Sequence, residues 1–221
     1  MAEFTHIPVM VGEVVELFGP VPAGVLVDAT VGGGGHAEAL LSAHDHLSLL
    51  GLDRDEDALA ASSERLAGFG DRVTLRHTRF DHLTEEVHAL GIDRVSGVLC
   101  DLGVSSPQLD RPDRGFSYRS HALLDMRMDR TQERTAADLV NTWSEAELAA
   151  LLRDAGDERF ARLIARAIVA NRPIERTDEL AEVIRSAIPA PARRRGGDPA
   201  RRSFQALRIG ANDELEMLGG P

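Results

Sequence analysis

Residues 25–41 read VLVDATVGGGGHAEALL, and the fold is decided in this stretch. An apolar, β-branched run bounded by turn residues is typical of a strand covered on both faces, so residues 25–27 are predicted to form a buried strand. Asp28 ends that strand, four glycines follow at 32–35, and a helix is expected to begin near His36. Such a helix directs its free N–H groups and the positive end of its dipole toward a ligand above the strand.

A second carboxylate has the spacing that nucleotide-binding folds use. The next apolar run, LSLLGLD, ends in Asp53, 18 positions after Gly35. In such folds an acid about 20 residues after the glycine loop accepts hydrogen bonds from the ribose hydroxyls. The glycines lack the spacing of a dinucleotide site, which favours a cofactor with an adenosine and no pyrophosphate, such as S-adenosylmethionine. A glycine turn that merely packs a helix tightly on a sheet is the structural alternative.

Strand and helix patterns alternate over the first hundred residues. After an amphipathic helix over residues 11–18, strand patterns cover residues 25–28, 47–53, 72–80 and 95–103. Strands separated by helices predict a parallel, doubly wound α/β sheet with its ligand at the carboxyl ends of the strands. Four candidate side chains fall at such ends: Asp28, Asp53, Phe80 and Asp101.

From Gly103 onward the pattern changes to a long, turn-rich loop and then to helices. Ser144 and Glu147 have the spacing of a capping box, and Thr177 is the expected N-cap of a later helix. A linker over residues 189–200 leads to a last helix over residues 200–218, with Asp198 as its expected N-cap. We expect this helix to dock on the core and return the chain to the sheet.

The composition narrows the class of protein. The sequence shows no signal peptide and no long apolar run, so we expect a soluble, cytoplasmic protein that does not enter a membrane. The single cysteine, Cys100, rules out an internal disulfide and is predicted to be buried in a strand. Without a CxxC pair or a tight His/Cys cluster, no metal site is predicted.

The charge is unevenly distributed. The formal net charge is −11, which disfavours non-specific binding to nucleic acid. All 25 basic residues are arginine, however, and five of them gather near the linker: Arg193, Arg194, Arg195, Arg201 and Arg202. Guanidinium groups pair with phosphate in a bidentate manner, so this cluster could hold RNA. A solvated, charged loop is the alternative.

Seven motifs follow one another along the chain: HIPVM (6–10), DATVGGGGH (28–36), DLGVSSPQLD (101–110), RGFSY (114–118), LDMRMD (124–129), RRSFQALRI (201–209) and NDEL (212–215). In this order they closely resemble the 16S rRNA (cytosine-N4)-methyltransferases, the ribosomal small-subunit methyltransferase H family. The resemblance implies a Rossmann-like class I S-adenosylmethionine-dependent methyltransferase fold with a small inserted helical domain.

The resemblance also implies an activity and a site. The expected reaction is methylation of the exocyclic N4 amino group of a cytidine in the decoding centre of 16S rRNA, within the small ribosomal subunit, with S-adenosyl-L-methionine as donor. The motifs carry over these cofactor contacts: Gly34, Gly35, His36, Asp53, Phe80, Asp101 and Gln108. Asp101 is in addition the catalytic candidate, as acceptor for the amino hydrogens during attack. Orientation of the cofactor is the alternative role for Asp101.

The expected domains are a cofactor-binding core over residues 1–104, a helical insertion that recognises RNA over 105–200, and a returning core helix over 201–221. Relatives continue with a Gly-Gly-Arg turn and a further segment that completes the sheet, so we expect a truncated member. A non-catalytic fragment that binds cofactor or ribosome, and a methyltransferase for small molecules, are the alternatives. Nicotinamide-dependent oxidoreduction is disfavoured by the glycine spacing. The oligomeric state stays open, with a homodimer as one option.

Three further side-chain roles stay open at this point. Phe116 and Tyr118, flanked by arginines, could stack on a base or anchor their loop to the helical domain. Phe80 could stack on adenine or pack in the core. His36 could bond the cofactor carboxylate or have a structural partner.

Overall fold

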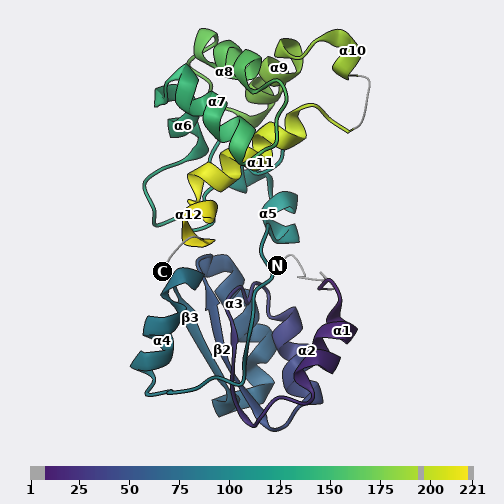
Figure 1. Cartoon of the computed structure of the whole chain (residues 1–221), viewed down its shortest axis with the longest axis vertical. Coiled ribbons are helices and arrows are strands. Elements are labelled where there is room, and N and C mark those ends of the chain that lie inside the picture. The colour runs from purple at the N-terminus through teal and green to yellow at the C-terminus, as the bar shows by residue number, and fades with distance from the viewer. Residues whose placement is uncertain (1–7, 194–196, 219–221) are drawn as a thin grey trace. The chain divides into compact units, whose positions relative to one another are not determined.

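The chain is described here from a computed structural model that covers residues 8–193 and 197–218. Contacts divide it into two compact units, residues 1–105 and 106–221, and each is described by itself (Figure 1). Several residues of the sequence motifs lie outside the described residues: His6, Ile7, Arg194, Arg195 and the last three positions of the chain.

The first unit is built on a four-stranded parallel sheet in the order β3-β2-β1-β4. The strands are β1 (Gly24–Asp28), β2 (Leu47–Asp53), β3 (Val73–His77) and β4 (Gly97–Leu99). The predicted α/β fold with a parallel sheet is confirmed. Asp28 pairs with Gly51 on one side and Leu99 on the other, so the carboxyl ends of the central strands meet at one edge. That edge is where the ligand site was expected.

Helices cover both faces of this sheet. They are α1 (Val11–Phe18), α2 (Gly35–Ala43), α3 (Glu56–Leu66) and α4 (Leu83–Ala89), with 3-10 turns η1 (Ala67–Arg72) and η2 (Phe80–His82). Neighbouring strand residues point to opposite faces. Leu26 and Leu49 therefore join a cluster with residues of α2 and α3, whereas Val27 and Leu50 pack against Val87 of α4.

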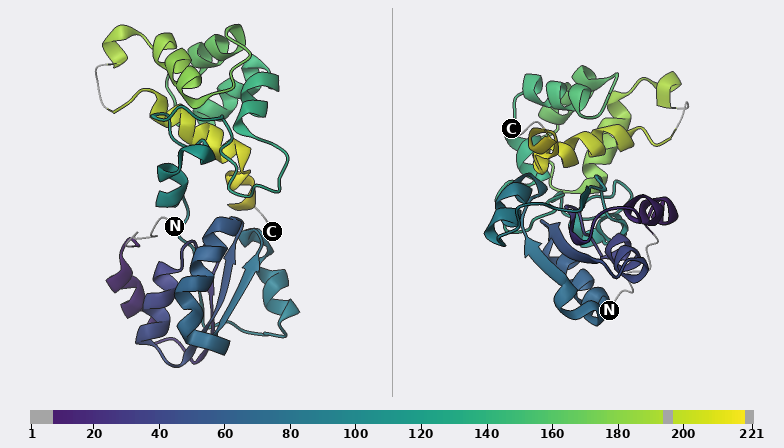
Figure 2. Two further views of the ribbon diagram at one scale, coloured as in Figure 1. Left: turned by 180° about the vertical axis from the view of Figure 1, so that it is seen from behind. Right: turned by 60° about the horizontal axis from the view of Figure 1, so that its bottom comes forward.

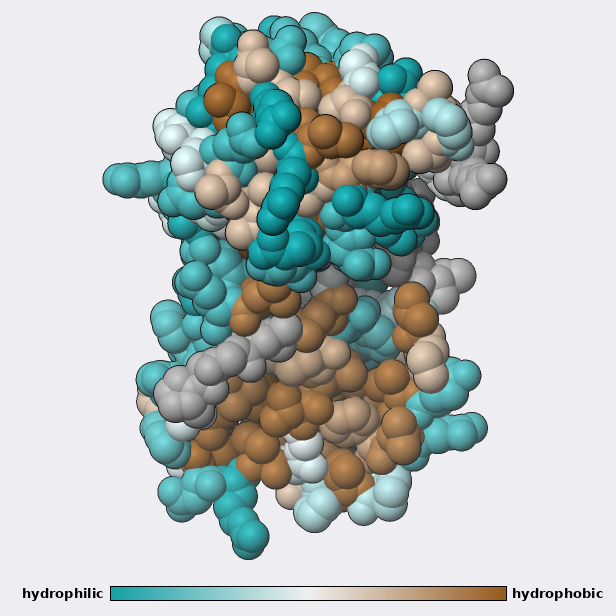
Figure 3. Space-filling view, turned by 45° about the horizontal axis from the view of Figure 1, so that its top comes forward, coloured by the Kyte–Doolittle hydropathy of each residue, from teal (hydrophilic) through white to brown (hydrophobic). Residues whose placement is uncertain are grey.

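Strand β4 is shorter than the predicted strand over 95–103, and it pairs only with β1 among the described residues. Beyond Leu99 the chain leaves the sheet, so Cys100 is exposed, and its predicted burial was wrong. Val98 and Leu102 are also exposed. Figure 3 shows apolar side chains gathered on one face of this unit. The position of β4 at the sheet edge is the physical reason for the error.

The second unit is helical (Figure 2). Its helices are α5 (Ser106–Asp110), α6 (Ala136–Thr142), α7 (Glu145–Asp154), α8 (Ala161–Ala170), α9 (Thr177–Ala187), α10 (Ala190–Arg193), α11 (Ala200–Ala211) and α12 (Glu214–Leu218), with a 3-10 turn η3 (Pro112–Arg114). None of the helices in the described ranges is long and apolar enough to cross a membrane. The same ranges hold no cluster of three His, Cys, Asp or Glu side chains that could bind a metal ion.

The helix caps in the structure match only some of the caps that the sequence predicts. At α7, Ser144 Oγ accepts the Glu147 N–H, and the Glu147 carboxylate accepts the Ser144 N–H, so the predicted capping box is confirmed. Thr177 is not an N-cap, because α9 is capped at Arg176. Thr177 is fully buried, and its hydroxyl donates to the Ser120 carbonyl. The Thr177 hydroxyl, which the sequence predicted as the helix cap, thus bonds a distant residue of the chain instead.

The predicted last helix is two helices, broken where Asp213 adopts a left-handed φ of 52°. The Asp198 carboxylate does accept the Ala200 N–H at the start of α11, although the assigned N-cap is Pro199. Helix α11 packs on α6, α7 and α9 in the helical unit, where the sequence prediction had placed it on the sheet. A Cβ on Gly210 would lie 2.7 Å from Leu151 Cδ2, so close packing on α7 explains this glycine.

Asn212, at the end of α11, holds the 124–129 loop in place. Its Oδ1 accepts the Met128 N–H at 2.8 Å, and its Nδ2 donates to the Met126 carbonyl at 2.7 Å and to the Arg208 carbonyl at 2.8 Å. The side chain is fully buried. Buried polar groups of the loop backbone therefore depend on this one amide.

We predict that Asn212→Ala lowers the free energy of unfolding by about 3 kcal/mol, because it leaves a buried N–H and a buried carbonyl unsatisfied. Urea denaturation measures the change. Asn171→Ala is the matched control: that exposed amide donates only to the Ala167 carbonyl at the end of α8, and its loss should cost less than about 1 kcal/mol. Equal losses in the two variants would contradict the anchoring role.

Candidate functional site

The loop between β1 and α2 is fastened to the strands on both sides of β1. The Ala29 N–H donates to the Leu99 carbonyl of β4 at 2.9 Å, and the Val31 N–H donates to the Leu52 carbonyl of β2 at 2.9 Å. These bonds hold the glycine loop over the carboxyl ends of three neighbouring strands. This is the place where open α/β sheets bind their ligands.

Asp53 joins this loop to β2. Its Oδ2 accepts the Gly32 N–H at 2.8 Å, and its Oδ1 accepts the Asp55 N–H at 2.9 Å. The N-cap of α3 is Asp55, whose carboxylate accepts the Asp57 N–H, so Asp53 is not the cap of that helix. A carboxylate oxygen has two lone pairs, so each oxygen of Asp53 can still accept a hydrogen bond from a ribose hydroxyl.

Gly34 and Gly35 are explained by contacts within the chain. Gly34 has a left-handed φ of 77°, and a Cβ there would lie 3.2 Å from Ser62 Cβ on α3. A Cβ on Gly35 would lie 2.4 Å from Pro8 Cγ. Both glycines therefore permit close packing, as the structural alternative expected. Their role as cofactor contacts stays a prediction.

Three carboxyl groups, those of Asp28, Asp53 and Asp101, gather at this edge of the sheet. Asp28 is buried, and burial raises the pKa of its carboxyl to about 7. The Thr30 N–H bonded to it at 3.2 Å opposes that rise, whereas the charges of Asp53 and Asp101 add to it. Burial also raises the pKa of Asp53. Such a site favours a positively charged ligand whose hydroxyl groups can donate hydrogen bonds to the carboxylates, and it disfavours a negatively charged pyrophosphate.

A hydrogen bond holds the backbone of Asp101, and its side chain is half exposed. Its N–H donates to Thr30 Oγ1 at 2.7 Å, while 55% of the side chain is exposed. His36 Nδ1 lies 4.0 Å from Asp101 Oδ2, and His36 Nε2 donates to the Val9 carbonyl at 2.9 Å. His36 thus has a structural partner in the N-terminal segment and lies beside the catalytic candidate.

The structure brings Asp53, His36 and Asp101 to one edge of the sheet, and it leaves two other candidates less defined. Phe80 is half-buried in η2, which follows β3. The Thr78 N–H donates to the Asp53 carbonyl at 2.9 Å, so this segment starts beside Asp53. Gln108 lies on α5 in the second unit. The cofactor roles of Phe80 and Gln108 stay predictions.

Thr30 was missed by the sequence analysis. It joins two of the carboxylate positions, because its N–H donates to Asp28 and its hydroxyl accepts the Asp101 N–H. The first of these bonds had a sequence signal, since an aspartate often accepts the N–H two residues later in an Asx turn. The second joins positions 71 residues apart and has no local signal.

The aromatic motif RGFSY anchors its own loop. Phe116 is buried, and Arg114 is buried beside it and donates to the carbonyls of Arg127 and Met128. Tyr118 packs edge to face on Phe204 of α11, with ring centroids 5.7 Å apart. These contacts favour the anchoring alternative over base stacking.

Comparison with known proteins identifies the family. The model of the MraW methylase family matches residues 3–220. The chain is 56% identical over 219 residues to the ribosomal RNA small subunit methyltransferase H of Thermobifida fusca, and the match covers 96% of this chain and 66% of that protein. It is 54% identical to the protein of the same name from Symbiobacterium thermophilum, with 97% and 69% covered. The same-named protein of Mycobacterium sp. strain KMS is 54% identical, with 96% and 60% covered.

The chain belongs to the MraW methylase family, which confirms the resemblance found in the motifs. It spans between 60% and 69% of the length of these three relatives.

The buried Asp28 leads to a prediction about pH. Its folded pKa of about 7 lies above the value of 3.8 in the unfolded chain, so the folded protein alone holds this proton between those two values. Stability contributed by Asp28 therefore falls as pH rises through that window, and the loss is complete above about pH 7. Asp28→Asn cannot ionise, and we predict that it stabilises the protein by up to about 4 kcal/mol near pH 8 and much less near pH 5.

Urea denaturation of both proteins near pH 5 and near pH 8 measures this difference. Asp45→Asn is the control, because the Asp45 side chain is fully exposed and its replacement should leave the pH dependence unchanged. A parallel pH dependence of Asp28→Asn and the unmodified protein would show that Asp28 is not the group that titrates.

Proposed function

We propose that this member of the MraW methylase family transfers a methyl group from S-adenosyl-L-methionine to the exocyclic N4 amino nitrogen of a cytidine in 16S rRNA of the small ribosomal subunit. One observation carries the proposal: the glycine loop, Asp53 and Asp101 meet at the carboxyl edge of a parallel sheet. The relatives that share this sequence are named as small-subunit rRNA methyltransferases, which supports the choice of substrate.

The residues at this edge fit the methyl donor. Asp53 has acceptor capacity left for the two ribose hydroxyls. The bound cofactor supplies an electrophilic methyl group on a positively charged sulfur. The carboxylates of Asp53 and Asp101 at this edge favour that cation and the ammonium group of its amino acid part, while Asp28 holds its proton up to about pH 7. A pyrophosphate would be repelled by the same charges, which argues against a nicotinamide dinucleotide.

Asp101 is suited to act on the amino group of the base. The lone pair of a cytosine amino nitrogen is delocalised into the ring, so the nitrogen must pyramidalise before it attacks. An acceptor for its hydrogens stabilises that change. The half-exposed Asp101 carboxylate can accept one amino hydrogen while Thr30 fixes its backbone, and it can then take the proton that the nitrogen loses. Alignment of the two reactants contributes much of the remaining rate.

Two measurements test the proposal. Isothermal titration calorimetry should show binding of S-adenosyl-L-methionine, and a radiolabelled methyl group should pass from it to immature small ribosomal subunits. Transfer to small metabolites and not to ribosomal subunits would overturn the rRNA substrate. Absence of cofactor binding would overturn the proposal as a whole.

We predict that Asp53→Asn weakens binding of S-adenosyl-L-methionine by about ten-fold or more, because a charged acceptor for the ribose diol is lost. Calorimetry measures the dissociation constant. Asp55→Asn is the matched control two residues away, since asparagine is also a good N-cap and α3 should keep its start. Equal affinities in Asp53→Asn and the unmodified protein would remove Asp53 from the site.

A second variant separates the two roles open to Asp101. If Asp101 accepts the amino hydrogens, Asp101→Ala should lower kcat by roughly a hundred-fold and change cofactor affinity by less than about three-fold. Single-turnover methyl transfer and calorimetry measure the two quantities. A loss confined to cofactor affinity, with kcat unchanged at saturation, would show that Asp101 orients the cofactor instead.

A further inference from the structure

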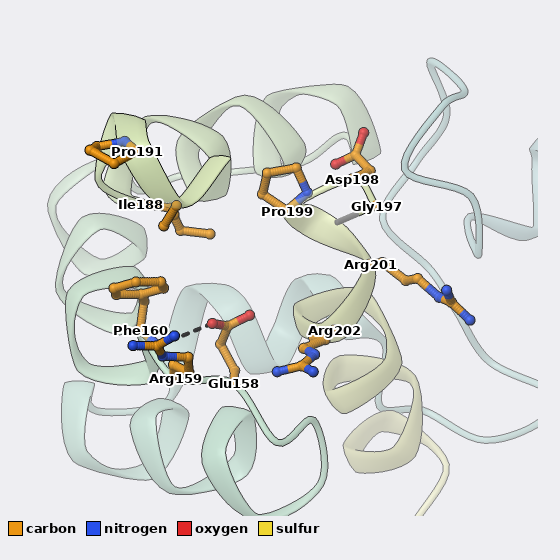
Figure 4. Close-up of a pocket in the computed structure, with 11 residues that line it drawn as sticks. Glu158, Arg159, Phe160, Ile188, Pro191, Gly197, Asp198, Pro199, Arg201 and Arg202 are labelled. Carbon is orange, nitrogen blue, oxygen red and sulfur yellow. Dashed lines mark hydrogen bonds between the residues drawn. The ribbon is translucent and has the colours of Figure 1, made fainter. Parts of the chain in front are cut away.

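A hollow of about 590 Å³ lies inside the helical unit, apart from the site described above (Figure 4). It opens where α8 and α11 begin and where α9 has just ended, so Phe160, Pro199 and Ile188 line it. A second hollow of about 460 Å³ shares Glu158, Arg159 and Phe160 with it. The size is within the range of pockets that bind small ligands.

The rim of this hollow suits an anion. Arg159, Arg201 and Arg202 line it together with Glu158 and Asp198, and the Asp198 carboxylate is paired with Arg185 at 2.8 Å. Within residues 8–193 and 197–218, Arg159 and Arg201 form no ion pair, while Arg202 lies 3.7 Å from the exposed carboxylate of Asp157. The N-terminal ends of α8 and α11, with their positive dipole ends, also face this region. Guanidinium groups and helix N-termini together favour a phosphate.

The wall of the hollow suits a nucleobase. Phe160 is half-buried and lines the hollow, and the Arg159 guanidinium carbon lies 5.5 Å from its ring centroid. Ile188 and Pro199 add apolar surface. Glu158 is 6% exposed, and its Oε1 accepts the Phe160 N–H at 3.0 Å, drawn as a dashed line in Figure 4. Its carboxylate keeps lone pairs that can accept from the amino group of a base.

We propose that this hollow binds one unpaired nucleotide of the substrate RNA, with the base stacked on Phe160, an amino hydrogen on Glu158, and phosphate on Arg159 and Arg202. Figure 4 shows Arg202 reaching toward Glu158 and Arg201 pointing away from the hollow, so Arg201 is assigned to the next phosphate along the strand. Single-stranded RNA is bound by this combination of aromatic stacking and arginine contacts. This inference rests on the proposed function in one respect, which is that the bound RNA is the substrate of methyl transfer.

The test uses the full chain and a fluorescein-labelled single-stranded RNA of roughly ten nucleotides, followed by fluorescence anisotropy. Phe160→Leu keeps an apolar side chain and removes the stacking face, and it should weaken binding by about ten-fold. Arg202→Gln should weaken binding about three- to ten-fold and reduce the slope of log affinity against log salt by about 0.7. Arg166→Gln is the matched control, since that α8 arginine is 70% exposed, pairs with Glu145 and does not line the hollow.

Affinities of Phe160→Leu and Arg202→Gln equal to that of Arg166→Gln would overturn the inference. A duplex RNA of the same sequence should bind more weakly than the single strand, because its bases are stacked and paired with one another and cannot reach Phe160. Equal binding of the two RNAs would overturn the base contact. Thermal melts show whether each variant is folded, and Phe160→Tyr, which keeps the ring, should bind like the unmodified protein. Cofactor binding and methyl transfer by the unmodified protein report on the proposed function separately, so failure of one is distinguishable from failure of the other.

Discussion

The hydrogen bond from the Gly32 N–H to the Asp53 carboxylate is the contact on which the proposed cofactor site depends. It connects the turn after β1 to the end of β2, and a parallel bond from Val31 to Leu52 supports it. This turn rises over the strand ends, and α2 starts within the glycine run, at Gly35. The packing of Gly34 on α3 and of Gly35 on Pro8 keeps that turn in one conformation.

The same turn brings acidic side chains together, and burial of one of them lowers the stability of the fold. Asp28 is buried between two carboxylates and holds its proton up to about pH 7 because of burial first and their charges second. A buried acid without a cationic partner destabilises a protein. If a cation occupies the proposed site in the working protein, its charge offsets the repulsion among these acids and so stabilises the bound form.

The sequence predicted the features that neighbouring residues determine, and it missed the features that depend on contacts between residues far apart in the chain. Residues 47–52 are mostly apolar and lead to the charged Asp53, and β2 covers the predicted range 47–53. The capping box at Ser144 is equally local. By contrast, the Thr177 hydroxyl is taken by the Ser120 carbonyl, and the length of β4 depends on its having one neighbour among the described strands. At the candidate site, the position of Asp53 at the end of β2 was predictable from the apolar run before it, whereas the bond from Asp101 to Thr30 spans 71 positions and was not predictable.

The central claim is that the methyl donor lies over the carboxyl ends of β1, β2 and β4. Amide hydrogen exchange with and without S-adenosyl-L-methionine tests it most directly, because exchange slows where a ligand orders the backbone. We expect protection concentrated in residues 29–36, at 53–55 and around Asp101. Protection confined to the helices after residue 106, or no change anywhere at a saturating concentration of the cofactor, would contradict the account.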